Sequence, residues 1–426
     1  MRAMLFISGF IAVGLVLAGV VAPASADVKV LLYNPDGTIK GISQGKKSKK
    51  NGSSGSSTDA KNKAGQFSPA DQYVEGELLV INPSRHFEVN ARPLGFSIVE
   101  SSDYPSLKLS VLRLRAPAKY TVPEAMAFLS AKFPRINVDA NHTYDITGTV
   151  PGGVEEVPQI AALTSSPATC GRGLRIGMID GGINVKHPTL AGQKVQYKRF
   201  GTKGMKVGPS AHGTAIAGMF VGKMSKQGLG GYVPAAELVA AGVQEVSPSR
   251  RIVARASNIL SAIEWLATKN VHVVNFNIAG ADNKALGTAV DRAHSKGMIM
   301  VAAVGNWGSN KTEAFPAAYA NVIGVTGVDK NKKIYSRANT GSYVDFAAQG
   351  VRVWAAGTTK GGQFMSGTSY ATPLISSLVA FETAKGKKAT PESVRSYLKK
   401  FSVDIGSSGK DATFGWGLIE RTSLCE

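Results

Sequence analysis

The chain has 426 residues, 43% of them hydrophobic, which is enough to bury a full core together with a second small domain. Its 49 Lys and Arg outnumber its 29 Asp and Glu, giving a net charge of +20 at pH 7. The segment from residue 151 onward contains 32 basic and 17 acidic residues. No nucleic-acid-binding motif accompanies this charge, so we exclude a nucleic-acid partner and interpret the charge as a solvated surface that favours acidic proteins or anionic envelopes.

The first 26 residues have the pattern of a signal peptide. Arg2 precedes a mostly apolar stretch from Met4 to Val21, and an A-x-A cleavage site ends at Ala26. We therefore expect cleavage after Ala26 and secretion to the periplasm or the medium, with no stable membrane insertion. The apolar stretch is near the length that spans a bilayer, so an uncleaved anchor is the alternative.

A linker and a small domain are expected next. Residues 27–72 are predicted to be a disordered linker, because the segment is rich in Lys, Gly and Ser and has little to bury. Residues 73–150 are typical of a compact α+β domain, and Thr121 with Glu124 forms a capping box that begins a helix. The predicted strands of this domain cover residues 77–81, 96–100, 107–114 and 136–138.

After a second linker at residues 151–169, the remainder of the chain, residues 170–426, alternates apolar strands with helical stretches. Strands are expected at residues 271–276 and 322–325, for example, and a helix at residues 257–269. Because strands that alternate with helices form parallel sheets, this pattern predicts an α/β domain with helices on both faces of the sheet.

Four polar residues stand at the ends of apolar runs in this domain. Asp180 follows the run from Arg175 to Ile179, and His212 begins the sequence H-G-T-A-I-A-G. Asn306 follows an apolar strand at residues 298–304 and a glycine, and Ser369 is the third residue of G-T-S-Y-A-T-P. Taken singly, such residues are usually helix caps or turn residues.

Together these residues supply the chemistry of nucleophilic catalysis. A free serine is too weak an acid to attack a peptide carbonyl unaided, so Ser369 needs a base. His212 has the pKa range for this base and for the later acid, and Asp180 would orient its ring. Asp precedes His by 32 residues, and His precedes Ser by 157.

The motifs around these residues resemble those of the subtilisin-like serine proteases, peptidase family S8. G-T-S-x-A-x-P and H-G-T-x-x-A-G match at every fixed position, and the order Asp, His, Ser is the subtilisin order. The resemblance implies a subtilisin-like parallel sheet with helices on both faces, and a secreted endopeptidase of class EC 3.4.21 that acts on proteins or peptides through an acyl-enzyme. It also implies that Asn306 and the backbone N–H of Ser369 form the oxyanion hole.

By the same resemblance, two segments line the substrate cleft. These are Asn277, Ile278, Ala279 and Gly280 on one side and Ala302 and Ala303 on the other. The family usually has S-L-G-G in the first segment, so Asn277 and Ala279 depart from its pattern. Gly181 departs as well, because Thr or Ser usually follows the catalytic Asp. We expect an apolar pocket for the residue before the cleaved bond.

The α+β domain resembles the inhibitory propeptide of subtilisin-like zymogens, usually a βαββαβ fold that blocks the cleft. The protein would then be a self-processing zymogen, a monomer with its own propeptide as inhibitor. The segment from Asp139 to Thr169 would contain the maturation site, with the linker at 151–169 as its expected place. An independent small binding domain that stays attached is the alternative.

The two cysteines, Cys170 and Cys425, bracket the catalytic domain, and we predict a disulfide between them; two free thiols are the alternative. The histidines form no metal cluster, and the chemistry needs no cofactor. Calcium is common in the family, but only Glu237 and Glu245 lie between residues 191 and 254, so structural calcium is possible without an assignable site.

Two other functions compete with a general endopeptidase. One is a processing protease dedicated to a single exported partner, which the residues do not distinguish from a degradative enzyme. The other is a binding scaffold on the same fold without catalysis. A scaffold would normally carry a substitution at one of the four catalytic positions, and none is present.

Overall fold

A computed structural model of the chain describes residues 30–33, 39–43, 72–147, 166–225, 228–386, 389–421 and 424–425. The chain divides into two units, residues 1–32 with 39–65 and residues 33–38 with 66–426. A two-stranded sheet of β1 (Val30–Tyr33) and β2 (Ile39–Ser43) lies in the stretch predicted to be a linker. The predicted signal peptide, the rest of this linker before residue 72 and the second linker up to residue 165 lie outside the described residues.

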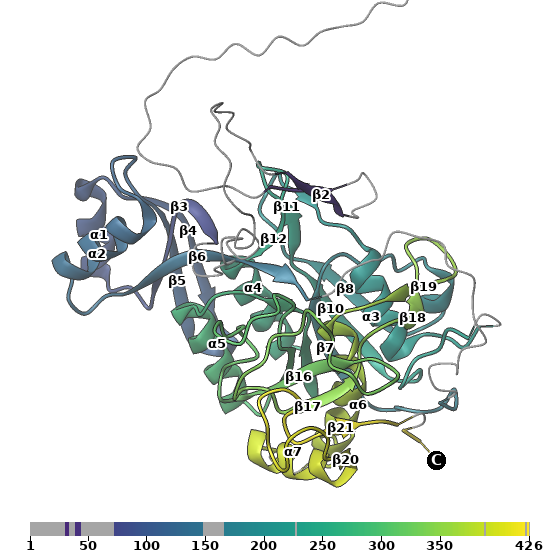
Figure 1. Cartoon of the computed structure of the whole chain (residues 1–426). Coiled ribbons are helices and arrows are strands. Elements are labelled where there is room, and N and C mark those ends of the chain that lie inside the picture. The colour runs from purple at the N-terminus through teal and green to yellow at the C-terminus, as the bar shows by residue number, and fades with distance from the viewer. Residues whose placement is uncertain are drawn as a thin grey trace, which may run out of the picture. The chain divides into compact units, whose positions relative to one another are not determined.

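A nine-stranded sheet forms the centre of the larger unit (Figure 1), with the strand order β20-β21-β17-β16-β15-β13-β7-β10-β8. All neighbouring strands in it run parallel except β20 and β21. Its strands are β7 (Arg175–Asp180), β8 (Val195–Arg199), β10 (Glu237–Gly242), β13 (Val273–Phe276), β15 (Ile299–Ala303), β16 (Val322–Val328), β17 (Phe346–Gln349), β20 (Ser402–Val403) and β21 (Leu418–Ile419).

The alternation of side chains along these strands builds one hydrophobic core on each face of the sheet. In β7, Ile176 and Met178 join one core, whereas Ile179 joins the other. The first core is closed by the helices α3 (Ala211–Val221), α6 (Thr372–Thr383) and α7 (Pro391–Leu398), and the second by α4 (Ala256–Ala267) and α5 (Lys284–Ser295). The predicted α/β fold with helices on both faces is thus confirmed.

The residues before the α/β domain fold as a βαββαβ unit with its own core. The capping box of Thr121 and Glu124 begins the second helix as predicted. The first helix was not predicted, although the Ser84 side chain caps it by accepting a hydrogen bond from the N–H of Phe87. The elements are β3 (Tyr73–Ile81), α1 (Arg85–Ala91), β4 (Ser97–Tyr104), β5 (Leu109–Arg115), α2 (Val122–Lys132) and β6 (Asn137–Ile146).

The last strand of this unit, β6, is much longer than the predicted strand at residues 136–138, and its extra length joins the two domains. It continues a second sheet of order β4-β5-β3-β6-β12-β11-β9, and β14 also pairs with it. The α/β domain contributes β9 (Lys206–Val207), β11 (Gln244–Val246), β12 (Ile252–Arg255) and β14 (Ile278–Ala279) to this sheet. It also forms a separate hairpin from β18 (Val353–Ala356) and β19 (Gly362–Met365).

Candidate active site

Three elements bring Asp180, His212 and Ser369 together. Asp180 is the last residue of β7, His212 lies in the first turn of α3, and Ser369 lies in a short 3₁₀ turn that leads into α6. His212 Nδ1 is 2.8 Å from Asp180 Oδ1, and His212 Nε2 is 2.8 Å from Ser369 Oγ. All three side chains are buried. The structure therefore places the three predicted residues in one hydrogen-bonded row.

The hydrogen bonds of Asp180 fix the proton positions of the imidazole. An ionised carboxylate can only accept, so Nδ1 of His212 must carry the proton in the bond to Asp180. Nε2 of the neutral ring is then an acceptor, and the Ser369 hydroxyl donates to it. This is the tautomer that a general base needs.

Asn306 follows β15 by three residues and is held beside the residue that precedes Ser369. Its Oδ1 accepts hydrogen bonds from the backbone N–H and the hydroxyl of Thr368, at 3.2 and 3.0 Å. These bonds orient its Nδ2, which is buried and has no hydrogen-bond partner among the described residues. Gly305 precedes it with a φ of +95°, a left-handed conformation that favours glycine. The amide is thus a free donor near Ser369.

A segment of the chain itself lies against Ser369, where the sequence predicts the substrate cleft. The backbone N–H of Ser369 donates to the carbonyl oxygen of Thr147 at 3.1 Å, and the N–H of Thr147 donates to the carbonyl oxygen of Asn277 at 3.0 Å. Just before, Ile146 pairs with Ile278 in the antiparallel ladder of β6 and β14. The end of β6 therefore binds as an extended peptide, whose final described carbonyl points at a backbone donor of the predicted nucleophile.

Two further side chains of this segment are held in the cleft. Tyr144 is fully buried, and its hydroxyl donates to the carbonyl oxygen of Ala281 at 2.9 Å. Its ring lies against Gly280, where a Cβ would come within 2.4 Å of it. Asp145 is partly buried, and this burial raises the pKa of its carboxyl to about 6, although the nearby Arg251 acts to lower it.

Polar contacts outside the cleft also hold the βαββαβ unit to the catalytic domain. The carboxylate of Glu264 on α4 accepts from the backbone N–H groups of Ser106 and Leu107, at 2.9 and 3.1 Å. The buried carboxylate of Glu77 accepts from the Asn141 side chain at 2.9 Å and lies 3.7 Å from the Arg255 guanidinium. Glu77 is therefore a buried charge with cationic and amide partners, as buried charges require.

The structure also places the predicted cleft residues. Ile278 and Ala279 pair with β6, the carbonyl oxygen of Asn277 accepts from Thr147, and Gly280 lies against the ring of Tyr144. The side chains of Ile278 and Ala302 belong to the hydrophobic core, and the backbone of Ala302 pairs within the central sheet. Ala279 and Ala303 are buried as well. Sequence reasoning missed Thr147, Tyr144 and Thr372, which lie in or next to the site.

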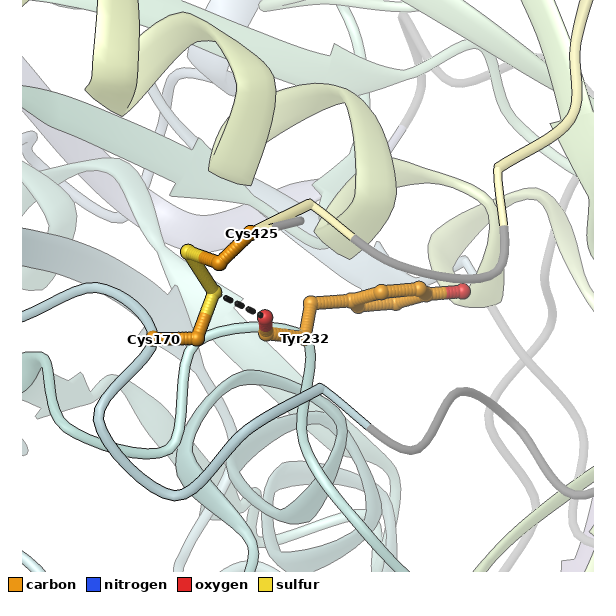
Figure 2. Close-up of a disulfide and its surroundings, with 3 residues drawn as sticks. All are labelled: Cys170, Tyr232 and Cys425. Carbon is orange, nitrogen blue, oxygen red and sulfur yellow. Dashed lines mark hydrogen bonds between the residues drawn. A yellow bond between two sulfur atoms is a disulfide. The ribbon is translucent and has the colours of Figure 1, made fainter.

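Cys170 and Cys425 form a disulfide (Figure 2) that joins the start of the catalytic domain to its end, across 255 positions of sequence. The sulfur of Cys170 lies 3.4 Å from the carbonyl oxygen of Tyr232. Within the described part of the chain, no three His, Cys, Asp or Glu side chains gather as a metal site would require. No helix in that part has the length and apolarity to cross a membrane.

Comparisons with known proteins agree with this geometry. Residues 171–417 match the sequence profile described as the subtilase family. Subtilisin E of Bacillus subtilis (strain 168) is 31% identical over 290 residues, covering 66% of this chain and 73% of that protein. Minor extracellular protease Epr of the same organism is 29% identical over 252 residues, covering 59% of this chain but only 38% of Epr.

Among solved structures, fervidolysin from Fervidobacterium pennivorans, a keratinolytic enzyme related to subtilisin, has the same fold. It superposes with a TM-score of 0.67 over 82% of this chain and 60% of its own, at 19% sequence identity. This superposition extends beyond the catalytic domain, because 82% of the chain exceeds the segment from residue 171 to 417.

Proposed function

The chain belongs to the subtilase family, and we propose that it is a serine endopeptidase, exported and made as a precursor that cuts itself. The observation that carries this proposal is the occupied cleft. The carbonyl oxygen of Thr147 accepts a hydrogen bond from Ser369, whose hydroxyl is already bonded to His212. A peptide carbonyl, a nucleophile and a base are thus assembled at one point.

The first half of the proposed reaction forms an acyl-enzyme. Ser369 Oγ attacks the peptide carbonyl carbon while its proton passes to Nε2 of His212, and Asp180 stabilises the imidazolium that results. The negative charge that develops on the carbonyl oxygen is stabilised by the N–H of Ser369 and by Nδ2 of Asn306. The C–N bond then breaks, and the leaving amine takes the proton from His212.

The second half returns the enzyme to its starting state. A water molecule gives one proton to Nε2 of His212 as its oxygen attacks the acyl carbon. The second tetrahedral intermediate uses the same two donors. When it collapses, Ser369 regains its proton from His212 and the new carboxylic acid leaves.

We assign the self-cleavage to the bond between Thr147 and Gly148. Thr147 is the residue whose carbonyl meets Ser369, and in an extended substrate this is the residue before the broken bond. This position lies within the segment predicted to contain the maturation site, but ahead of the linker at 151–169 where the cut was expected. The βαββαβ unit would then be an inhibitory propeptide, whose last strand stays in the cleft as product.

Export is supported by three features. The first 26 residues have the pattern of a cleavable signal, and the one disulfide is typical of proteins that leave the cytosol. One relative is named as an extracellular protease. The chain covers only 38% of that relative's length, so the cleavage of any substrate other than the chain's own segment is also a proposal.

The test compares residues 27–426 with the same chain carrying Ser369→Ala, by intact mass and by N-terminal sequencing. We expect the wild type to give fragments 27–147 and 148–426, and the variant to stay whole. Processing of the variant would favour the scaffold function instead. So would a result in which the wild type and the variant both stay whole and neither hydrolyses casein. A cut elsewhere would reject the assigned bond alone, and processing without casein hydrolysis would favour a dedicated processing protease.

A further inference from the structure

The catalytic carboxylate has a partner outside the triad. Nδ2 of Asn277 donates to Oδ2 of Asp180 at 2.8 Å, and Oδ1 of Asn277 accepts from the Thr372 hydroxyl at 2.8 Å. Asn277 is fully buried. Its side chain therefore lies between the end of β7, which carries Asp180, and the start of α6, which follows the nucleophile.

The orientation of this amide follows from the chemistry of its neighbours. A carboxylate has only acceptor atoms, so the Asn277 atom that faces Asp180 must be the NH₂ group. The opposite atom, Oδ1, then accepts from Thr372, whose hydroxyl can donate. Reversing the amide would set two acceptors against each other in a buried place, which is costly.

No other described side chain supplies this bond. Oδ1 of Asp180 accepts from the N–H of Gly181 at 2.6 Å and from His212 at 2.8 Å, whereas His212 is 3.1 Å from Oδ2. Gly181 has no side chain to offer. A Cβ added to Gly181 would lie only 2.6 Å from Oε1 of Gln244. Oδ2 thus depends on Asn277 for its shortest hydrogen bond.

The backbone of the same residue binds the peptide in the cleft. The carbonyl oxygen of Asn277 accepts from both the N–H and the hydroxyl of Thr147, at 3.0 and 2.9 Å. The Thr372 hydroxyl that reaches Asn277 is also 2.8 Å from the carbonyl oxygen of Ser369. Because the Thr372 hydroxyl has one proton, it donates to only one of these two acceptors at a time, and Thr372 thus places the Asn277 amide next to the segment of the nucleophile.

We propose that Asn277 is a positioning residue of the triad, whose amide holds the Asp180 carboxylate against His212 while its backbone carbonyl holds the residue before the cleaved bond. This inference rests on the proposed peptidase function. It accounts for two departures from the family motifs at once, because Gly181 and Asn277 meet at the same carboxylate.

Removal of the amide has a distinct kinetic signature. The Asn277→Leu variant keeps the backbone carbonyl, so KM should change little, whereas kcat should fall about 10- to 100-fold because the carboxylate no longer holds the imidazole in its productive orientation. A carboxylate without this donor stabilises the protonated imidazole more strongly. The acidic limb of the kcat/KM profile should therefore move to higher pH.

The experiment uses residues 27–426 after self-processing, with a chromogenic peptide of the sequence Tyr-Asp-Ile-Thr, which copies residues 144–147. Wild type, Asn277→Leu and Thr372→Val are compared across pH, together with their melting temperatures. Thr372→Val removes the partner of Oδ1 but leaves the donor to Asp180. We expect it to lower kcat less than Asn277→Leu does, and to leave the acidic limb in place.

The outcomes separate this inference from the proposed function. A wild type that hydrolyses no peptide overturns both. An active wild type with an Asn277→Leu variant of equal kcat and unchanged acidic limb overturns the positioning role alone. A variant that loses activity in proportion to its melting temperature, with its acidic limb unmoved, shows a merely structural residue and overturns it too.

Discussion

The backbone N–H of Ser369 donates a 3.1 Å hydrogen bond to the carbonyl oxygen of Thr147. This bond connects the 3₁₀ turn before helix α6 in the catalytic domain to Thr147, the last described residue before the second linker. It sets the register of the whole segment, because Ile146 and Asp145 then pair with Ile278 and Ala279. The residues from Tyr144 to Thr147 consequently show how the cleft binds an extended peptide.

The oxyanion role of Asn306 gives the first prediction. Asn306→Ala should lower kcat by on the order of 10²–10³, the loss found when such a donor is removed from a subtilisin. KM should change little, because the buried Nδ2 makes no hydrogen bond in the ground state, which the bound carbonyl of Thr147 represents. Steady-state hydrolysis of the Tyr-Asp-Ile-Thr peptide measures both constants. A variant with normal kcat would assign the oxyanion hole elsewhere.

Asn306→Asp is a matched control for this prediction. It keeps the size of the side chain and the acceptor for Thr368 but replaces the donor by a second oxygen. It should be at least as impaired as the alanine variant, because a carboxylate repels the developing negative charge. Recovery of activity in Asn306→Asp would contradict the donor role.

The four positions of the proposed catalytic site could be predicted from the sequence because each stands in a short motif that resembles those of the family. A buried strand ends at Asp180, small residues follow His212, and Gly367 begins the motif of Ser369. The α/β alternation is likewise local. Asn306 was predicted from its motif, and its free Nδ2 follows from the bonds of Oδ1 to Thr368, which only the structure reveals.

The resemblance implied that a propeptide blocks the cleft, but the residues that do so could not be predicted in this way. The strand predicted at residues 136–138 continues to Ile146, although Val138, Ala140, Tyr144 and Ile146 do alternate along it. The intervening polar residues Asn141 and His142 concealed this signal, because their partners Glu77 and Asn283 come from distant segments. Polar residues that are buried because of partners distant in the sequence produce no local alternation that would predict a strand.

The contact between Tyr144 and Gly280 gives a second prediction. Tyr144→Ala should weaken inhibition by fragment 27–147 by roughly 100-fold or more, because truncation of a buried aromatic side chain costs about 3–5 kcal/mol. The hydroxyl bond to Ala281 is lost as well. Inhibition of the processed enzyme, measured with the chromogenic peptide, tests this. Unchanged inhibition would show that the ring contributes nothing to binding.

Two variants control for this interpretation. Tyr120→Ala removes a tyrosine that stacks on Phe128 inside the βαββαβ unit, and its effect reports the cost of a weaker fold without a change in the cleft. Gly280→Ala places a methyl group where the ring of Tyr144 lies. It should weaken binding of the wild-type fragment but relieve part of the defect of Tyr144→Ala.

The disulfide between Cys170 and Cys425 gives a third prediction. Replacing both cysteines by serine should lower the free energy of unfolding by up to about 5 kcal/mol, since the bond closes a loop of 255 positions. Denaturant unfolding of the processed enzyme with and without reductant measures the loss. The double variant should match the reduced wild type, and kcat should hold because the bond lies away from the triad. Equal stability in all samples would deny the bond a structural role.

The carboxyl of Asp145 gives a fourth prediction, on pH. In the cleft its pKa is raised from 3.8 to about 6 by burial, so the bound strand favours the protonated form. Binding of fragment 27–147 is therefore tightest below about pH 4 and weakens as the pH rises toward 6, where the loss levels off. Acid should hold the fragment in the cleft, and neutral pH should release it. The weakening should amount to roughly 10- to 100-fold, because the side chain keeps some exposure.

Asp145→Asn isolates this effect from every other titrating group, including His212 and the new carboxylate of Thr147, because these are common to both proteins. The dissociation rate of the fragment after processing, followed by size-exclusion chromatography from pH 4 to 7, should rise with pH more steeply in the wild type than in the variant. At pH 7 the variant should hold its fragment longer, since its amide stays uncharged. Arg251→Gln removes the neighbouring cation that opposes the shift, and it should move the steep part of the wild-type curve to higher pH. Parallel curves for wild type and Asp145→Asn would show that the carboxyl of residue 145 stays ionised in the cleft.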